Sequence, residues 1–345
     1  MLGELIERAG PLVRHRVLAE VEDRGARWPV RALELGPERD DTPLLIIVGG
    51  VHGLERIGSQ VALAFLSALL GRLLWDSATE HLLERARLWI LPVLNPVGMA
   101  RGTRSNGRGV DLMRNAPGAA PVSLAPGSPP LGGAPGGPVT WLVGGQRLSP
   151  WLPWYRGPAG GPMEPEAAAL VDWVERGVAR APVAIALDVH SGFGTSDRLW
   201  FPWAHTRQPM PHLAELRALV GLLDASQPHH VYRVEPQAHA YTIQGDLWDH
   251  IYARHLAAAR PGLFLPLTLE MGSWLWVKKN PRQLFSRLGS FNPIQPHRVR
   301  RILRRHAALI DFLHRAVASR ESWSALSDER RRLLTDEAYL AWYAR

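Results

Sequence analysis

The 345-residue chain contains no cysteine, and Lys278 and Lys279 are its only lysines. The absence of cysteine excludes disulfides and thiolate ligands, so a metal could be held only by His, Asp or Glu side chains. No apolar run reaches the length that spans a bilayer, and the N-terminus lacks the basic and apolar regions of a secretory signal. We therefore expect a cytoplasmic protein without a membrane partner.

Almost all of the positive charge comes from arginine, and the formal net charge is +8. The densest basic segment, residues 298–305, carries five arginines, with Val299, Ile302 and Leu303 between them at roughly helical spacing. This spacing indicates a helix with a solvated basic face. We therefore expect no nucleic-acid partner. A hydrophobic content of 46% with 21% charged residues is ordinary for a globular protein.

Four short apolar runs have the length and composition of buried strands. They cover residues 44–48, 87–94, 183–189 and 263–270. Further patterns predict helices at residues 57–75, 164–180, 212–226 and 297–319, and the first forty residues indicate a helix followed by strands. Strands that alternate with helices are typical of an α/β protein, and we predict a three-layer α/β/α sandwich around a mixed, largely parallel sheet.

The domain organisation follows from the same patterns. We expect a single domain over residues 1–320, followed by a helical tail over residues 321–345. Residues 117–150 interrupt the domain with a stretch that is too rich in proline and glycine for a helix or a core strand. A loop of this length is usually either functional or disordered. Two interpretations stay open: an insertion beside a functional site, or an excursion without function.

A candidate metal site follows the first predicted strand. In Val-Gly-Gly-Val-His-Gly-Leu-Glu, residues 48–55, a glycine turn precedes His52 and Glu55, and both side chains are acceptable zinc ligands. Two other strands end at His190 and Glu270. Because α/β enzymes assemble their sites at the carboxyl ends of strands, these residues could meet around one ion. Taken singly, His190 could equally be a capped core histidine, and Glu270 the first acid of a helix.

Several motifs, in the same order along the chain, resemble those of the zinc carboxypeptidase family, which includes related amidases and deacylases. The matching segments are His52-Gly53-Leu54-Glu55, Asn95-Pro96-Val97-Gly98, residues 102–106, residues 109–115, Tyr155-Arg156-Gly157-Pro158, residues 164–166, residues 188–191 and residues 268–270. The likeness spans roughly residues 44–275, and the ordered combination is far more specific than any one motif. It implies that the predicted domain is a zinc carboxypeptidase-like catalytic domain.

The resemblance also implies the metal ligands and the acid–base residue. Zn2+ would be held by His52, Glu55 and His190, with one position open for water or substrate. Glu270 would take a proton from the water and then protonate the leaving amine. Asp111 would accept a hydrogen bond from a ligating imidazole, which we expect to be that of His52, and would fix its tautomer.

Four further side chains would contact the substrate, as the resemblance implies. Arg104 would polarise the scissile carbonyl and stabilise the developing oxyanion. Arg114, with Asn115 beside it, would bind a substrate carboxylate. Tyr241 lies 29 residues before Glu270, close to where the family often has a tyrosine that caps the substrate.

The sequence departs from the family pattern at Met113, where the family commonly has asparagine. A thioether donates no hydrogen bond, so one usual contact to a free C-terminal carboxylate is missing. The principal prediction is a zinc metallocarboxypeptidase that acts on a peptide. An amidase or deacylase of cell-wall peptides or small N-acyl amino acids stays open, and a binding module without activity is a third interpretation. Asp246 and Asp249 could face a specificity pocket, but we favour a structural role for them.

Overall fold

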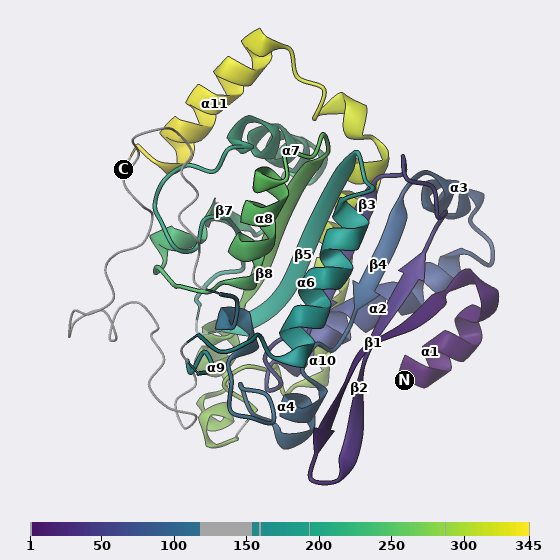
Figure 1. The fold of residues 1–345 in the computed structure, drawn as a ribbon, viewed down its shortest axis with the longest axis vertical. Coiled ribbons are helices and arrows are strands. Elements are labelled where there is room, and N and C mark those ends of the chain that lie inside the picture. Colours follow the sequence, from purple (N-terminus) through teal and green to yellow (C-terminus); the bar gives the residue numbers. More distant parts are fainter. Residues whose placement is uncertain (1, 118–153, 159, 193, 287, 345) are drawn as a thin grey trace.

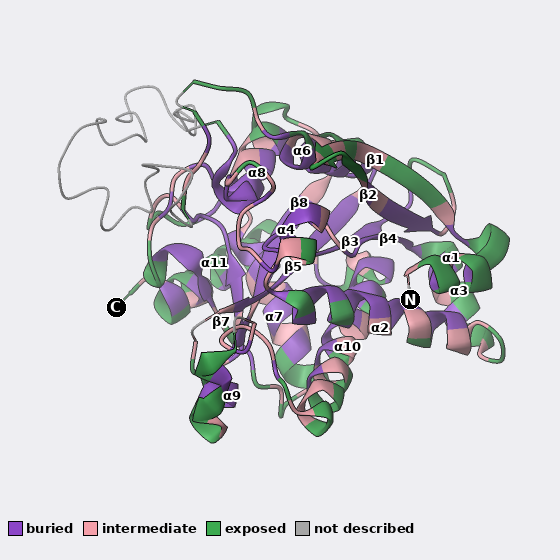
Figure 2. Ribbon diagram, turned by 90° about the horizontal axis from the view of Figure 1, so that it is seen from below, coloured by how far each residue is buried: buried purple, intermediate pink, exposed green. Residues whose placement is uncertain are grey.

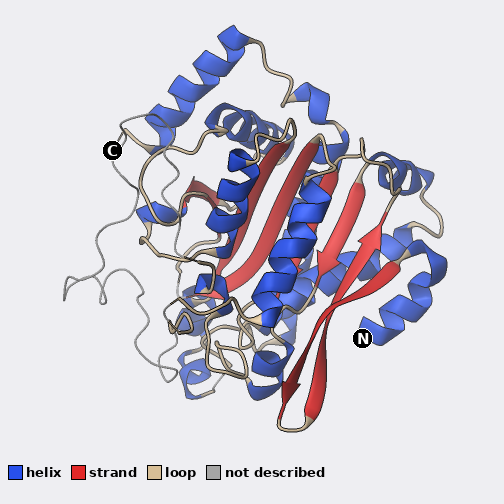
Figure 3. Cartoon of the chain, in the orientation of Figure 1, coloured by secondary structure: helices blue, strands red, loops and turns tan. Residues whose placement is uncertain are grey.

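The computed structural model describes residues 2–117, 154–158, 160–192, 194–286 and 288–344, so the predicted insertion lies almost wholly outside the described residues. Eight strands form one sheet, which is shown in Figure 3. Their order across the sheet is β1 (Arg14–Asp23), β2 (Ala26–Leu35), β4 (Arg87–Leu91), β3 (Leu44–Gly49), β5 (Val183–Gly192), β8 (Leu263–Gly272), β6 (Arg198–Phe201) and β7 (Arg233–Pro236).

The four predicted strands are the central strands of this sheet. β4, β3, β5 and β8 pair in parallel, whereas β2 and β6 run antiparallel to their inner neighbours. β3 and β4 are buried along their whole length. Because helices cover both faces of a parallel sheet, such strands have no solvent-facing side and appear as continuous apolar runs. The mixed, largely parallel sheet between helices confirms the predicted fold class (Figure 1).

Two strand ends differ from the prediction. β4 ends at Leu91 rather than at residue 94, because Pro92 has no amide hydrogen to donate to the ladder. β5 and β8 continue to Gly192 and Gly272. The predicted site residues on these two strands therefore lie within the sheet and not in the loops beyond it.

Helices cover both faces of the sheet (Figure 2). α6 (Pro165–Val178) and α8 (Leu247–Ala257) lie on one side, and α2 (Arg56–Arg72) and α10 (Pro296–Ala318) lie on the other. The remaining α-helices among the described residues are α1 (Leu2–Ala9), α3 (Ser77–Arg85), α4 (Pro96–Arg101), α7 (Leu213–Ser226), α9 (Trp274–Lys279) and α11 (Asp328–Trp342). Short 3-10 helices are η1 (Gly10–Leu12), η2 (Leu112–Arg114), η3 (Gln237–His239), η4 (Pro281–Phe285) and η5 (Arg320–Ser322).

No single helix among the described residues is long and apolar enough to cross a bilayer. α2 and α3 meet that criterion only as a pair, and the pair is bent by 119° at its break.

The C-terminal tail packs back on the domain. α11 lies against α7, and Arg331 forms an ion pair with Glu215 of that helix. The ring of Trp342 lies 4.8 Å from that of Phe201, measured between centroids. α11 lies within the segment predicted as a helical tail, and Leu334, Ala338 and Trp342 are the side chains of this helix that the domain buries.

A glycine sets the distance between α2 and the central sheet. A Cβ atom added at Gly58 would lie 2.2 Å from the backbone oxygen of Val189. That oxygen belongs to β5, one residue before His190. The helix that follows Glu55 can therefore approach the strand of the second histidine only because residue 58 has no side chain.

We expect Gly58→Ala to lower the free energy of unfolding by about 1–3 kcal/mol, because the extra carbon must displace packed backbone. Gly71 is the matched control in the same helix, since an added Cβ there meets nothing within 4 Å. Gly71→Ala should raise the free energy of unfolding by up to about 1 kcal/mol. Urea unfolding measures both values, and equal effects would contradict the close approach of helix and strand.

Candidate metal centre and active site

Three parallel strands deliver the predicted ligands and the predicted base to one edge of the sheet. After β3, the chain turns at Gly50, whose φ of +63° suits a residue without a side chain, and reaches His52. His190 on β5 and Glu270 on β8 are direct partners in the parallel register. Their side chains therefore project from the same face. The register brings together residues that are far apart in the sequence.

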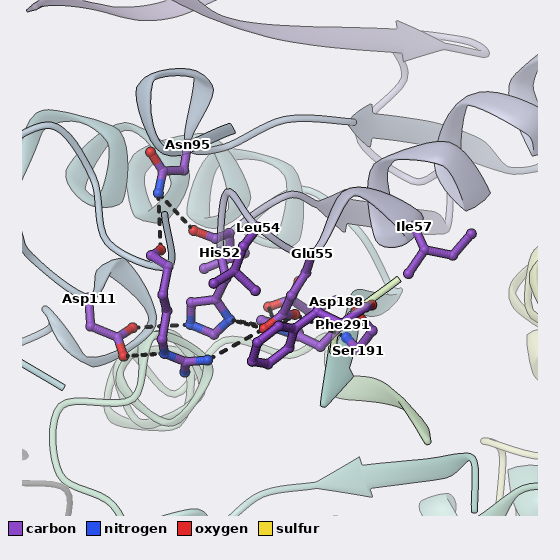
Figure 4. A network of polar contacts seen from close by, with 12 residues as sticks. His52, Leu54, Glu55, Ile57, Asn95, Asp111, Asp188, Ser191 and Phe291 are labelled. Carbon is purple, nitrogen blue, oxygen red and sulfur yellow. Dashed lines mark hydrogen bonds and ion pairs between the residues drawn. The ribbon is translucent and has the colours of Figure 1, made fainter. Parts of the chain in front are cut away.

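His52, Glu55 and His190 form a buried cluster of three donor groups. Figure 4 labels His52 and Glu55 within the surrounding network of polar contacts. His52 Nδ1 lies 2.9 Å from Glu55 Oε1 and 3.2 Å from His190 Nδ1. His190 Nδ1 also lies 3.2 Å from Glu55 Oε2. One ligand atom of each residue lies within 4.8 Å of the other two. Two imidazoles and one carboxylate that converge in this way are the donor set of a catalytic zinc site.

The outward nitrogen of each imidazole contacts a carboxylate. His52 Nε2 lies 3.1 Å from Asp111 Oδ1, which is the contact that the family resemblance implied. His190 Nε2 lies 2.7 Å from Asp188 Oδ2, and Trp248 Nε1 donates to the same oxygen at 2.8 Å. A carboxylate at Nε2 favours the proton on that nitrogen, and the Nδ1 lone pair then stays available to a metal.

Asp188 is a residue whose role the sequence analysis missed. It is 0% exposed and lies two residues before His190 on β5, so both side chains project from one face of the strand. The Asp-x-His spacing on a predicted strand was the available signal. It gives His190 the same kind of partner that Asp111 gives His52.

The charges of the cluster fit a divalent cation. Burial opposes ionisation of Glu55, but His52 and His190 outweigh it and lower the pKa of Glu55 far below its usual range. Burial likewise disfavours the charged form of His190, yet Asp188 and Glu55 raise its pKa well above the usual value. A pocket that favours positive charge at the His190 imidazole also favours a metal ion beside it. These donors and their partners therefore fit zinc.

Glu270 faces the cluster from β8. A Cβ atom added at Gly192 would lie 2.3 Å from Glu270 Oε1, so the carboxylate rests against the backbone of β5 two residues beyond His190. Burial raises the pKa of Glu270 to about 8, and the nearby Glu55 also raises it. The side chain remains half-buried. A carboxyl group that titrates near neutral pH and is open to substrate suits a general base.

Arg104 is linked to the metal ligands through a buried carboxylate. Its Nε donates to Asp111 Oδ2 at 3.0 Å, and its Nη1 lies 3.4 Å from Glu55 Oε1. Burial would raise the pKa of Asp111, but Arg104 and His52 outweigh it and hold the pKa far below its usual range. The side chain of Arg104 is 22% exposed, so part of the guanidinium is open to a substrate.

Arg114 lies deeper in the site and is 5% exposed. Among the residues that the structure describes, its Nε and Nη1 have no hydrogen-bond partner. Arg156 Nε donates to the backbone oxygen of Arg114 at 2.9 Å and fixes this part of the chain. A buried guanidinium with open donors is costly unless an anion meets it. These open donors leave Arg114 able to pair with an anion, and its role in binding a substrate carboxylate stays a prediction.

Asn115 is hydrogen-bonded to backbone at both ends of its amide group. Its Nδ2 donates to Arg156 O at 2.9 Å, and its Oδ1 accepts from Glu164 N at 2.6 Å. Only the second amide hydrogen could serve a substrate, so the substrate-binding role of Asn115 stays a prediction. Met113 is buried in the hydrophobic core and supplies no hydrogen bond in its place.

Tyr241 stands at the rim of the site. It is 41% exposed, and its ring packs edge-on against Trp200 with 5.9 Å between centroids. Burial of the hydroxyl end and the charge of Glu270 raise the pKa of Tyr241, whereas Arg114 and Arg104 lower it. The charges of these three side chains therefore act on the Tyr241 hydroxyl group, and the capping role itself stays a prediction.

Asp246 and Asp249 make the structural contacts that we favoured for them. Asp246 Oδ1 accepts hydrogen bonds from the backbone N–H groups of Trp248 and Asp249, both at 2.9 Å, and caps α8. Asp249 Oδ2 accepts from Ala204 N at 2.9 Å and contacts His205 Nδ1 at 2.6 Å.

Two asparagines hold the loops that carry the site. Asn95 Nδ2 donates to the backbone oxygens of Val51 at 3.3 Å and Arg104 at 3.4 Å (Figure 4). Asn292 Nδ2 donates to Leu54 O at 2.7 Å, and its Oδ1 accepts from the first turn of α2 at 2.9 Å. Asn95 belongs to a motif, but no sequence signal marked Asn292, because its partners lie far away in the chain.

The model of the zinc carboxypeptidase family matches residues 22–273 of this chain. The chain belongs to the zinc carboxypeptidase family. The matched segment contains every site residue predicted from the sequence, from His52 to Glu270. The resemblance inferred from the motifs is thereby confirmed, and the cluster described above is the expected His-Glu-His zinc triad.

Several known proteins are similar to this chain. Carboxypeptidase SOL1 from Arabidopsis thaliana is 29% identical over 90 residues, which are 26% of this chain and only 18% of that protein. Bovine thrombin-activatable fibrinolysis inhibitor, solved with tick carboxypeptidase inhibitor, has 18% identity and a TM-score of 0.61 over 92% of this chain and 95% of its own. Carboxypeptidase A from Helicoverpa armigera has 17% identity and a TM-score of 0.60 over 94% and 72%. The structural likeness shows a shared fold.

We expect Asp111→Asn to weaken zinc binding by roughly 10- to 100-fold, because the neutral amide no longer holds the His52 imidazole in its ligating tautomer. Competition with a chromogenic chelator measures the affinity. Asp336→Asn, at an exposed position of α11, is the matched control and should bind zinc as the unchanged protein does. An unaltered affinity in Asp111→Asn would show that this contact does not support the ligand.

Proposed function

We propose that this chain is a zinc-dependent metallocarboxypeptidase that releases the C-terminal residue of a peptide. The observation that carries the proposal is the buried guanidinium of Arg114, whose Nε and Nη1 have no partner in the described part of the chain. A planar guanidinium pairs with a carboxylate through two parallel hydrogen bonds. The free carboxylate at the end of a peptide would meet this group while the last peptide bond lies near the metal ligands.

The residues of the site divide the chemistry among them. Zinc held by His52, Glu55 and His190 would lower the pKa of a water molecule and polarise the scissile carbonyl. Glu270 would accept the proton of the attacking water and deliver it to the leaving amine. Arg104 would donate hydrogen bonds to the carbonyl oxygen as negative charge develops there. Asp111 contacts both Arg104 and His52, and it would hold these two side chains in a fixed position relative to each other.

Substrate orientation falls to the side chains around this centre. Arg114 would fix the terminal carboxylate and thereby place the last peptide bond within reach of Glu270. Tyr241, at the rim beside Trp200, would cover the bound residue and exclude water. Both roles depend on a peptide substrate, which membership of the family implies.

A second candidate is an amidase or deacylase of cell-wall peptides or small N-acyl amino acids. The burial of Met113 and the backbone contacts of Asn115 favour it, because Arg114 then has no amide beside it to complete a site for a terminal carboxylate. Arg114 alone could bind a carboxylate elsewhere in a substrate. The two candidates share the metal and the base. They differ in whether Arg114 binds the terminal carboxylate of a peptide or a carboxylate elsewhere in the substrate.

We expect Glu270→Gln to retain zinc but to lose roughly 10²- to 10⁴-fold in rate, because an amide of the same shape cannot accept the proton. A mixed-peptide digest followed by mass spectrometry, with and without a chelator, measures the activity, and metal analysis measures the zinc. Glu80→Gln, at an exposed position of α3, should leave both unchanged. Full activity in Glu270→Gln would refute the assignment of the base.

We expect the protein to cleave a peptide with a free C-terminus much faster than the same peptide with a C-terminal amide. Arg114→Met should reduce kcat/KM for the free acid by roughly 10- to 100-fold, because a hydrogen-bonded charge pair is lost. Cleavage of the amide should stay the same. Arg108→Met, whose side chain is 70% exposed, is the control. If the unchanged protein cleaves acid and amide equally well, the amidase or deacylase interpretation is the better one.

A further inference from the structure

The net positive charge of the chain is concentrated in one segment. Residues 271–310 contain nine Lys and Arg residues and no Asp or Glu, whereas the rest of the chain has 31 basic and 32 acidic residues. The net charge of +8 therefore comes entirely from this segment. It begins directly after Glu270 and includes α9, η4 and the first part of α10. Charge of one sign on one part of a surface attracts a partner of the opposite sign.

α9 presents apolar and basic side chains together. Leu275 is 37% exposed, and Lys278 and Lys279 are exposed one turn later. Residues three and four apart on a helix share a face, so these three side chains lie next to one another. Trp276 and Val277 point the other way and are buried. α9 itself lies at the periphery of the molecule, with exposed residues over much of its surface (Figure 2).

η4, which packs against α9, continues the same composition. Phe285 is 93% exposed, which is the highest value for a large apolar side chain among the described residues, and Leu284 is 48% exposed. Arg282 is exposed beside them. We refer to six of these side chains as the α9 platform: Leu275, Lys278, Lys279, Arg282, Leu284 and Phe285.

The backbone of the α9 platform is fixed from the inside. Ser273 N donates to Gly192 O at 2.8 Å, next to the backbone against which Glu270 rests. Gln283 is 0% exposed, and its Nε2 donates to Gly289 O at 3.0 Å. The exposed side chains are therefore held outward by a packed base, and they are not exposed because the segment frays.

We propose that the α9 platform docks on the surface of an anionic phospholipid bilayer. Within the described part of the chain, Lys278, Lys279 and Arg282 form no ion pair, so their charges are available to lipid phosphates. Leu275, Leu284 and Phe285 can enter the boundary between headgroups and acyl chains. Basic residues beside exposed leucine and phenylalanine are the composition of segments that lie in this interface.

Two other partners fit the α9 platform less well. A nucleic acid would use the cations and could stack on an aromatic ring, but it gains nothing from exposed leucine. A second copy of the chain in a two-fold contact would bring the same three cations, Lys278, Lys279 and Arg282, of both copies into one interface, and like charges repel. The sequence alone led us to expect no membrane partner, because no apolar run is long enough to span a bilayer. The exposure of Leu284 and Phe285 is a property of the folded chain. The docking is independent of the proposed peptidase activity.

The test is flotation of the full chain with vesicles of phosphatidylcholine alone or mixed with phosphatidylglycerol. We expect binding only to the mixed vesicles, with an affinity that falls as salt is added. The double variant Lys278→Ala/Lys279→Ala should bind more weakly by roughly fivefold for each lysine removed. Leu284→Ser/Phe285→Ser should weaken binding by at least about tenfold. Thermal unfolding of each variant verifies that it is folded.

The tail helix α11 offers matched controls. Leu333→Ser/Leu340→Ser removes side chains that are 48% and 70% exposed, and Arg330→Ala/Arg332→Ala removes two exposed charges. Both double variants should bind vesicles as the unchanged protein does. The proposal is overturned if no vesicle is bound, or if neutral and anionic vesicles are bound equally. It is also overturned if Leu284→Ser/Phe285→Ser binds the vesicles as the unchanged protein does while RNA competes with the vesicles for the protein. A variant Leu284→Ser/Phe285→Ser whose only change is that a dimer dissociates would overturn it as well.

Discussion

The parallel register of β3, β5 and β8 is the constraint on which the rest of the structure depends. It places His190 directly opposite Glu270 and sets the end of β3 beside β5, so that the loop with His52 and Glu55 opens onto the same edge. A slip of one residue would turn a ligand to the other face of the sheet. Gly58 and Gly192 support this register, because a side chain at either position would press on Val189 or Glu270.

The electrostatics of the site follow from this geometry. Glu55, Asp111 and Asp188 are buried within contact of two imidazoles and one guanidinium. Burying carboxylates is costly, and their mutual placement would be unfavourable without positive charge between them. A divalent cation held by His52, Glu55 and His190 would supply that charge, so we expect metal binding to stabilise the same arrangement that binds it. The contacts of Asp111 with His52 and of Asp188 with His190 also orient the two imidazoles toward the ion.

β8 also connects the site to the molecular surface. Only three residues separate Glu270 from α9, and a backbone hydrogen bond from Ser273 to Gly192 fixes the start of that helix on β5. The strand that carries Glu270 is therefore followed directly by the segment that supplies the net positive charge. The same segment contains Phe285, the most exposed large apolar side chain among the described residues. A surface bound through α9 and η4 would hold the catalytic edge at a defined distance from it.

The sequence by itself determined the central strands, the fold class, the His-Glu-His ligand set and the contact between Asp111 and His52. These depend on local patterns, namely apolar runs and short motifs at strand ends, and on a family resemblance that the motifs carry. Only the tertiary structure decided that Asp188 pairs with His190, that Asn292 holds the loop of Glu55, that both ends of the Asn115 amide are occupied, and that Phe285 faces solvent. Each of these depends on which distant segments meet, because hydrogen-bond partners and burial are set by packing between elements and not by the residues next to them in the chain.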